Sequence, residues 1–249
     1  MKKSERHLKI REILEEKGRT KVTDLAVLLE TSTETIRADL EQLEGQSLLI
    51  KEHGWARINK SIDLVPLVYR FNEDLNDKQR ISVRALQEIK DGQIVYIDGG
   101  STILAGIRLL KSKNDITIVT DSFSVVSKCM EMKINTIFLG GDVHLLEQRI
   151  GGYFAIQMIN HLQIDLAILG SRGIKNTNGF TTVATYGIEL MRHVIDHCEK
   201  VIVVCDQNKF QKNGSFVYAN FNEIDTLITN VLSDEQFELV KDIKTIIQV

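Results

Sequence analysis

The segment between residues 22 and 58 restricts the possible folds more than any other part of this chain. Its apolar residues recur at the three- and four-residue spacing of helices that pack one face on a core, first at Leu25, Ala26, Leu28 and Leu29 and then at Ile36, Leu40 and Leu43. Polar residues 30–32 separate the two groups. Two short helices joined by so tight a turn predict a helix-turn-helix, a motif that places its second helix in the major groove of DNA.

The second helix is expected to begin near Ser32, because Thr31 and Glu34 form a capping-box pattern. The unpaired N–H groups at such a helix start suit a DNA phosphate. The groups expected to read double-stranded operator DNA lie opposite the apolar face or at the helix start: Ser32, Thr33, Thr35, Arg37 and Ala38. Arg37 is the one long donor among them, so we predict that it makes the main base contact.

Residues 48–58 predict a hairpin, because apolar and polar residues alternate on both sides of Gly54. A hairpin after the recognition helix is a wing, and its Lys51 and Arg57 are candidate DNA contacts. Trp55 is expected to pack on its own domain. The alternative is a small helical subdomain with a solvated outer face, but the order of cap, helix and wing favours a winged helix-turn-helix over residues 1–58.

Net charge gives DNA binding no support. The whole chain carries a formal charge of −3, and acidic and basic side chains balance within residues 1–58. Affinity must therefore come from the local placement of cations and from paired operator half-sites. This requirement predicts a homodimer or a homotetramer.

Residues 59–76 lack a sustained periodicity and contain the only proline of the chain, so they are expected to form a linker. From residue 77 to residue 249, β-branched apolar runs such as Ile94–Ile97 and Val201–Cys205 alternate with helical stretches. Such runs predict a mostly parallel sheet that helices cover on both faces. The expected fold is an α+β winged helix-turn-helix domain followed by an α/β domain.

Polar or glycine-rich residues follow five of the expected strands, at the edge where open α/β sheets bind ligands. Gly99 to Thr102 would offer N–H groups and two hydroxyls to an anion, with Lys209 as the main opposing charge. Tight turns need glycine in any case, but these positions favour a phosphate site. The candidate effector-binding residues are Asp98, Gly99, Gly100, Ser101, Thr102, Asp121, Gly141, Arg172, Asp206 and Lys209.

The chain resembles the DeoR family of bacterial sugar-metabolism regulators almost from end to end. The resemblance rests on an ordered series of short matches, which includes Ser32, Thr35-Ile36-Arg37, Asp39-Leu40, His53-Gly54, Arg70, Asp98-Gly99-Gly100-Ser101-Thr102, Gly140-Gly141, Gly170, Gly179, Asp206 and Lys209-Phe210. It implies a C-terminal domain similar to ribose-phosphate isomerases and CoA transferases. It also implies a repressor of a carbohydrate-metabolism operon that responds to a phosphorylated sugar or a related metabolite.

Several positions depart from the pattern of this family. Where the resemblance would place a charged trio lining the sugar pocket, this chain has Ala184, Gly187 and Met191. Asp121 stands where an asparagine is usual, Ala38 where a second arginine is common, and Trp55 where a glycine is usual. The phosphate end of the pocket is thus kept, whereas the sugar end and the operator are expected to differ from those of typical relatives.

No run of residues is apolar enough to span a membrane, and the N-terminus lacks the apolar stretch of a signal peptide, so a cytoplasmic protein is expected. The three cysteines show neither disulfide nor zinc spacing, the histidines show no metal-ligand set, and no cofactor or metal is expected.

Two other functions remain open. The chain could be a sugar-phosphate isomerase or transferase with an attached DNA-binding domain, in which Asp98, Asp121 or Asp206 would be the base. It could also be a regulator that has lost its effector and responds to a protein partner. Because the charged trio best suited to isomerase chemistry is missing, a regulator without enzymatic activity is the expected function.

Overall fold

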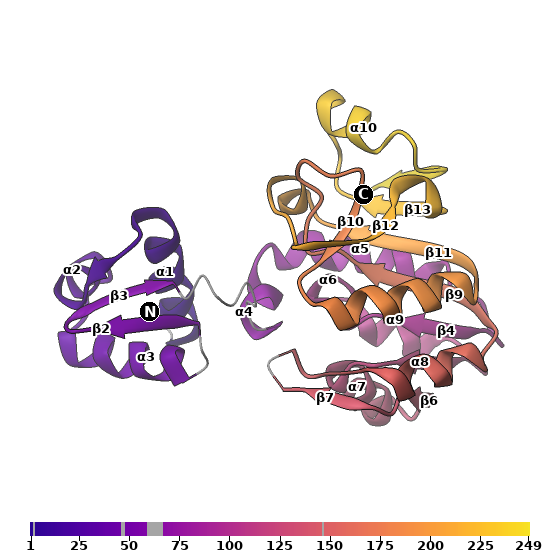
Figure 1. Ribbon diagram of the computed structural model, residues 1–249, viewed down its shortest axis with the longest axis horizontal. Helices are drawn as coiled ribbons and strands as arrows, with labels where there is room; N and C mark the ends of the chain where they lie inside the picture. The colour runs from indigo at the N-terminus through magenta and orange to yellow at the C-terminus, as the bar shows by residue number, and fades with distance from the viewer. Residues whose placement is uncertain (2, 46–47, 59–66, 146) are drawn as a thin grey trace. The chain divides into compact units, whose positions relative to one another are not determined.

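The computed structural model of the protein describes residues 1–249 except 2, 46–47, 59–66 and 146 (Figure 1). The chain divides into two compact units, Met1–Tyr69 and Arg70–Val249. Residues 59–66, the first part of the predicted linker, lie outside the described residues. Among the helices that the structure does describe, none has the length and apolar character needed to cross a membrane.

The first unit is a winged helix-turn-helix, as predicted. Its elements are α1 (Lys3–Lys17), β1 (Thr20–Lys21), α2 (Val22–Leu28), α3 (Thr33–Gly45), β2 (Leu49–Glu52) and β3 (Trp55–Ile58). The apolar faces of the three helices meet in one core that includes Ile10, Leu14, Leu25, Ile36, Leu40 and Leu43, all at most 1% exposed. The sequence did not indicate β1, which adds a third strand to the wing by pairing with β3.

The turn of the wing depends on two residues with positive φ. His53 has φ 38° and Gly54 has φ 83°, and they join strands whose register pairs Glu52 with Trp55 and Leu49 with Ile58. A two-residue turn with positive φ at both positions matches the twist of the strands it joins. Glycine adopts such a φ without strain, which explains why Gly54 marks this hairpin in the sequence.

The second unit is built on a seven-stranded sheet in the order β14-β13-β11-β9-β4-β5-β6. Its strands are β4 (Ile94–Ile97), β5 (Thr117–Thr120), β6 (Asn135–Phe138), β9 (Ile164–Gly170), β11 (Cys198–Cys205), β13 (Thr226–Thr229) and β14 (Thr245–Gln248). Every neighbouring pair in this sheet is parallel. The prediction of a mostly parallel sheet is confirmed, although β14 was not expected.

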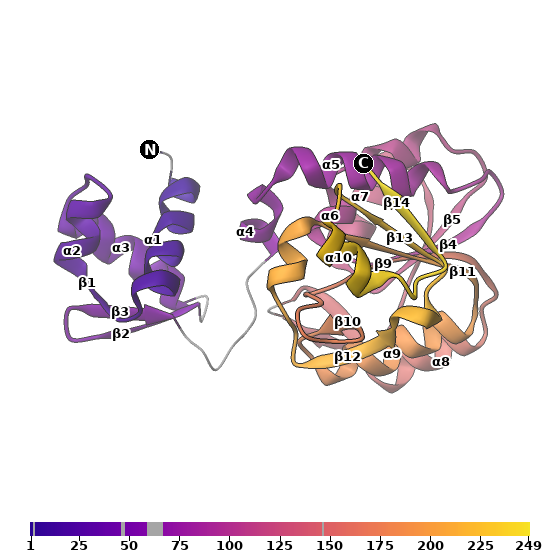
Figure 2. The ribbon, with the colours of Figure 1, turned by 90° about the horizontal axis from the view of Figure 1, so that it is seen from above.

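Helices cover both faces of this sheet. Figure 2 shows α5 (Leu75–Gln87) and α7 (Phe123–Met132) on one side of the strands, and α8 (Tyr153–Asn160) and α9 (Thr185–Asp196) on the other. The remaining helices are α4 (Leu67–Asn72), α6 (Ser101–Leu104), η1 (Ile107–Ser112), η2 (Gln207–Gln211), η3 (Phe221–Glu223) and α10 (Asp234–Val240). Strands covered on both sides need apolar residues throughout, and residues 201–205 of β11 are all buried.

Two antiparallel ribbons lie outside the parallel sheet, and the sequence pattern indicated neither. One joins β7 (Asp142–His144) to β8 (Arg149–Gly151), and the other joins β10 (Gly179–Thr182) to β12 (Phe216–Asn220). The β7–β8 hairpin is held against the loop after β5, because Ile150 N donates to Asp121 O and Phe123 N donates to Gln148 O. This contact brings residues of the hairpin to the carboxyl edge of the sheet.

Candidate functional site

The recognition helix α3 is capped by Ser32. Its Oγ accepts from Thr35 N at 3.2 Å, and its carbonyl accepts from Ile36 N at 3.1 Å. The cap is therefore Ser32 itself and not the predicted Thr31–Glu34 box, although the helix begins where expected. Arg37 and Ala38 are exposed, whereas Ile36 is fully buried. The predicted reading face thus points to solvent.

Asp39 anchors the recognition helix to α1. Its carboxylate is 1% exposed and accepts from Arg6 Nε at 2.5 Å and from Arg6 Nη2 at 3.1 Å, with His7 Nε2 at 2.9 Å. Burial alone would raise the pKa of Asp39, but the hydrogen bonds from Arg6 and His7 outweigh it and hold the pKa below its usual value. No local sequence pattern indicated this cluster, which fixes the orientation of α3.

The wing gathers more basic side chains than the sequence indicated. Lys51 Nζ lies 3.3 Å from Glu44 Oε2, and Arg57 Nε donates to Glu52 Oε1 at 3.0 Å. Two further cations contact Trp55, since Arg19 Cζ and Lys21 Nζ lie 4.9 Å and 5.1 Å from the centre of its ring. Trp55 therefore packs within its own domain.

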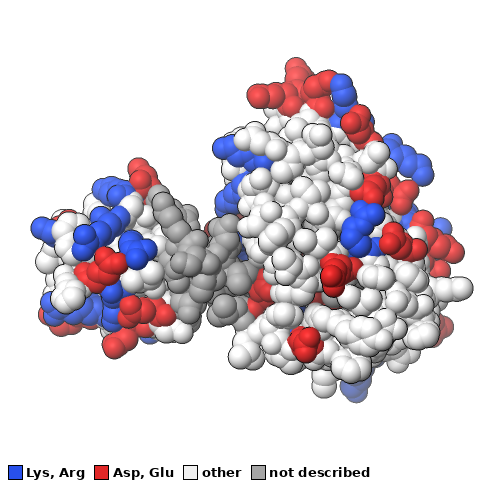
Figure 3. Space-filling model, in the orientation of Figure 1, with Lys and Arg blue, Asp and Glu red and all other residues white. Residues whose placement is uncertain are grey.

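These exposed ion pairs hold their cations only weakly, so Lys51 and Arg57 remain able to exchange an acidic partner for a phosphate. Figure 3 shows acidic and basic side chains interspersed over the visible face of this unit. Binding to DNA must therefore rest on the position of individual cations, as the balanced charge of the sequence suggests.

In the second unit, the structure brings the strand-end residues together at the carboxyl edge of the sheet. Thr102 Oγ1 lies 3.5 Å from Asp206 Oδ2, which links α6 to the residue that caps η2. Ile174 N donates to Lys209 O at 2.9 Å, which places the segment after Arg172 against the same helix. However, α6 spans only Ser101–Leu104, so its dipole adds little to an anion site at its start. Charge must come from side chains.

Two of the predicted site glycines are required by close backbone packing. A Cβ on Gly99 would lie 2.4 Å from Ser122 Oγ, so the loop after β4 could not approach the loop after β5 with a larger residue. Gly141 has φ 144°, and a Cβ there would lie 2.3 Å from Gly151 O. Gly141 thus allows the close packing of the β7–β8 hairpin.

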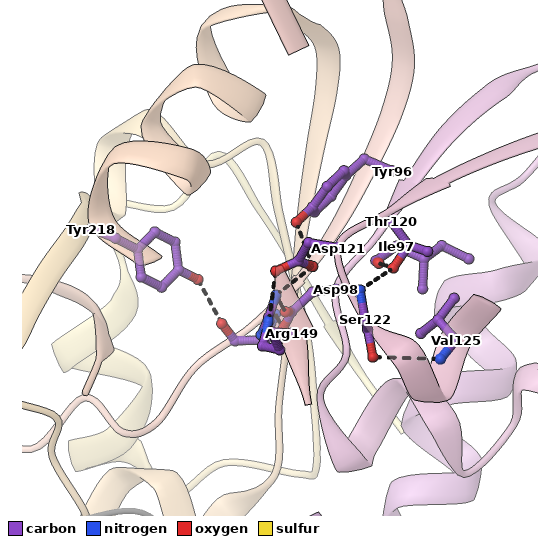
Figure 4. A network of polar contacts seen from close by, with 10 residues as sticks. Tyr96, Ile97, Asp98, Thr120, Asp121, Ser122, Val125, Arg149 and Tyr218 are labelled. Carbon is purple, nitrogen blue, oxygen red and sulfur yellow. Dashed lines mark hydrogen bonds and ion pairs between the residues drawn. The ribbon is translucent and has the colours of Figure 1, made fainter. Parts of the chain in front are cut away.

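The centre of this edge is an ion-pair network around Arg149, a residue that the sequence did not single out (Figure 4). Arg149 Nε and Nη2 donate to Asp121 Oδ2 and Oδ1 at 2.7 Å and 2.8 Å, and Nη2 lies 2.5 Å from Asp98 Oδ1. Tyr96 Oη donates to Asp121 Oδ1 at 3.0 Å, and Gly170 N donates to Asp98 Oδ2 at 3.0 Å. Asp98 and Asp121, two of the three predicted effector-binding carboxylates, are thus bound by groups of the protein.

Burial disfavours the charge on Arg149, yet Asp121 and Asp98 more than compensate and raise its pKa well above the usual value. The one available sequence signal was Asp121 itself. An aspartate where the resemblance expects asparagine adds a buried negative charge, and such a charge needs a cationic partner.

Three more cations, Arg70, Arg172 and Lys209, belong to this part of the second unit, and Arg172 is close enough to influence the pKa of the other two. Burial, with smaller contributions from Lys212 and Arg172, lowers the pKa of Lys209 to about 8 even though Asp206 opposes the shift. Burial and the charge of Arg172 likewise lower the pKa of Arg70 to about 10. Arg70 was part of the sequence resemblance but not a predicted site residue. Cations held this close together and shielded from water gain stability when an anion binds among them.

The side of the site toward α9 carries few charges. Ala184 precedes the helix, while Gly187 and Met191 are buried on it. Beside them, His144 of the hairpin stacks on Tyr186, with ring centres 3.5 Å apart and 7° between the planes. This side therefore offers small and aromatic groups to a ligand, whereas the opposite side offers cations.

Comparisons with known proteins agree with both units. The family model of the DeoR C terminal sensor domain matches residues 73–231, and that of the DeoR-like helix-turn-helix domain matches residues 6–62. The glycerol-3-phosphate regulon repressor of Escherichia coli K12 is 26% identical, and the match covers 96% of this chain and 99% of the repressor. The HTH-type transcriptional regulator FruR of Bacillus subtilis is 29% identical, and the match covers 98% of this chain and 97% of FruR.

Among solved structures, ribose 5-phosphate isomerase A of Methanocaldococcus jannaschii is similar in fold, and the match covers 55% of this chain and 54% of the isomerase chain. Its TM-score is 0.39 at 18% identity.

Proposed function

Because this chain belongs to the DeoR family of transcriptional regulators, we propose that it represses a carbohydrate-metabolism operon and leaves its operator when a phosphorylated sugar or a related metabolite binds the second unit. The observation that carries the proposal is the gathering of cations at one edge of the sheet. Arg149 forms ion pairs with Asp98 and Asp121, and the buried Lys209 lies beside Asp206. Arg172 is close enough to lower the pKa of both Arg70 and Lys209. Relatives named as a glycerol-3-phosphate regulon repressor and an aga operon repressor support it.

For DNA, the proposal assigns base reading to Arg37 and phosphate contacts to Ser32, Thr33, Thr35, Lys51 and Arg57, with Ala38 facing the groove. The exposure of Arg37 and the Ser32 cap support this assignment. One winged domain with balanced charge binds DNA weakly, so a homodimer or homotetramer would place two such domains on paired half-sites. Such a regulator would act in the cytoplasm.

For the effector, the proposal places a phosphate between Lys209 and Arg172, beside the N–H groups of Gly99 and Gly100 and the hydroxyls of Ser101 and Thr102. Burial supports this role for Lys209, because the charge of a residue that is only 6% exposed gains most from a bound anion. Asp98, Asp121 and Asp206 would shape the site and would balance its charge. Discrimination among sugars should be loose, since Ala184, Gly187 and Met191 offer no charged group to the hydroxyls.

A catalytic role is not part of the proposal. Asp98 and Asp121 both form ion pairs with Arg149, which occupies the oxygens that a general base would use. Asp206 is engaged by Asn208 N and Thr102 Oγ1.

The test is a thermal-shift screen of the full chain with sugar phosphates and the matching unphosphorylated sugars. A ligand at a hundred times its Kd should add roughly 2.7 kcal/mol of stability. Hits are then added to the protein bound to operator DNA, where fluorescence anisotropy should report release. Lys209→Ala should shift the response to higher effector concentrations, and Lys111→Ala, at an exposed lysine of η1, should leave it unchanged. A stronger response to the unphosphorylated sugars would contradict the proposal.

A further inference from the structure

The sheet edge formed by β6 is surrounded by exposed apolar side chains. On α7, Phe123 and Met130 are 37% and 72% exposed, and their seven-residue spacing places them on one side of the helix. The other members come from the hairpin and from α8. Together they form what is here named the β6 face: Phe123, Met130, Val143, Leu145, Tyr153 and Phe154.

The elements that carry the β6 face are joined to one another. The ring of Phe123 meets that of Phe138 of β6 edge-on, with centres 5.0 Å apart. Phe123 N donates to Gln148 O in the hairpin, and Gly140 N donates to Met158 Sδ of α8. Figure 1 shows α7, β7 and α8 gathered around β6. The exposed apolar groups therefore belong to one region of the second unit.

The two edges of the sheet differ sharply in charge. Residues 134–162, which include β6, the hairpin and α8, contain only Asp142, Glu147 and Arg149 as charged residues, and Arg149 is engaged in its ion pairs. On α7, Lys128 and Glu131 pair with each other. Beside the other edge strand, β14, residues 234–244 contain six: Asp234, Glu235, Glu238, Lys241, Asp242 and Lys244. Figure 3 shows charged side chains gathered over α10 and few over α8 and β7.

Proteins protect edge strands that remain exposed by placing charges around them. The β14 edge has this protection and the β6 edge lacks it. A large exposed apolar patch that includes aromatic and methionine side chains and few charges has the composition of a protein interface. The β6 edge therefore has the features of a protein interface.

We propose that the β6 face is the surface through which two copies of this chain associate about a twofold axis. A twofold axis brings each patch against an identical patch, so any net charge on it would face the same charge. A patch with so few charges avoids this repulsion and complements itself. The proposal rests on the proposed function in one respect, because reading paired half-sites requires two copies of the winged domain.

The test measures the mass of the full chain by sedimentation velocity and light scattering, without DNA or sugar phosphate. Wild type should be a dimer or a higher even-numbered oligomer. Leu145→Glu with Phe154→Glu should raise the dissociation constant at this interface at least about a hundredfold, because each copy would bury unpaired carboxylates. The matched control is Val231→Glu with Phe237→Glu, at side chains 72% and 45% exposed outside the face, which should keep the wild-type mass.

A second measurement does not depend on a destabilising charge. Tyr153→Cys should form a disulfide between copies under mild oxidation, whereas Val231→Cys should not. A wild-type monomer, an unchanged mass in the Leu145/Phe154 variant or equal cross-linking of both cysteine variants would overturn the proposal. A failed effector screen with the predicted mass changes would contradict only the proposed function.

Discussion

The guanidinium group of Arg149 makes two parallel hydrogen bonds to the carboxylate of Asp121, at 2.7 Å and 2.8 Å. The same group lies 2.5 Å from Asp98 Oδ1. One cation from the β7–β8 hairpin thus joins the residue that follows β4 to the residue that follows β5. The geometry of the proposed effector site and the stability of the second unit both depend on this cation.

Arg149→Met should destabilise the second unit by about 3–5 kcal/mol, because it leaves two buried carboxylates without their partner. Chemical unfolding followed by circular dichroism measures this loss. Adding Asp98→Asn and Asp121→Asn to the variant should recover much of it, since the uncompensated charges are then gone.

The matched control for Arg149 is Arg80→Met, which removes an arginine whose side chain is 59% exposed and pairs with Asp77. An exposed pair of this kind contributes less than about 1 kcal/mol. Equal losses in the two variants would mean that the network around Arg149 has no special role in stability.

Lys209 should make effector binding depend on pH. Its pKa of about 8 in the free protein results mainly from burial, and a bound phosphate would raise that pKa by stabilising the charged form. Affinity should therefore fall about tenfold per pH unit above pH 8, until the pKa of the complex is reached. Calorimetry between pH 7 and pH 9 should also detect proton uptake on binding near pH 8.

Two substitutions test separately whether effector binding needs a positive charge at residue 209 and whether titration of Lys209 causes its pH dependence. Lys209→Ala should weaken a phosphorylated effector by about 1.5–3 kcal/mol at pH 7. Lys209→Arg keeps a charge throughout this range, so its affinity should stay flat with pH even if it is lower. A wild-type affinity that does not change between pH 7 and pH 9 would rule out Lys209 as the phosphate ligand.

Arg37→Ala should cost about 1–3 kcal/mol of binding free energy on the specific operator and should reduce the preference for it over a scrambled duplex. The reason is the exposed position of Arg37 on the outer face of α3. Anisotropy titrations with both duplexes measure the two effects. The control is Arg108→Ala, at an exposed arginine of the second unit, which should bind both duplexes like wild type. If Arg37→Ala weakens binding to both duplexes equally, Arg37 contacts a phosphate and not a base.

Asp39→Asn should destabilise the winged unit by about 1–3 kcal/mol at pH 7, because the hydrogen bonds from Arg6 and His7 would lose their charged acceptor. The pKa of Asp39 is lowered in the folded state. Its contribution to the stability of the winged unit is therefore fully present above pH 3.8, the ordinary pKa, and is lost as the pH falls through the lowered pKa of the folded state. Wild type and variant should therefore converge at low pH. Trp55 is the only tryptophan of the chain, so its fluorescence during urea unfolding reports this unit alone.

Local patterns in the sequence determined most of the secondary structure. The spacing of Ile36, Leu40 and Leu43 gave the recognition helix, Gly54 gave the turn of the wing, and the apolar run Val201–Cys205 gave a central strand. Each signal works because helix and strand periods and turn conformations involve neighbouring residues only. The short strands β1 and β14 and the two antiparallel ribbons lack such signals, because their pairing depends on distant segments.

The sequence also indicated that Asp98, Asp121 and Lys209 would meet at one edge, since parallel strands place their carboxyl ends together. Only the tertiary structure decided what these residues do there. Arg149 lies 28 residues from Asp121, as Arg6 lies 33 residues from Asp39, and no local pattern marks such pairs. Burial of the folded site, a property of the whole fold, lowers the pKa of Lys209 and makes Arg149 the necessary partner of two carboxylates.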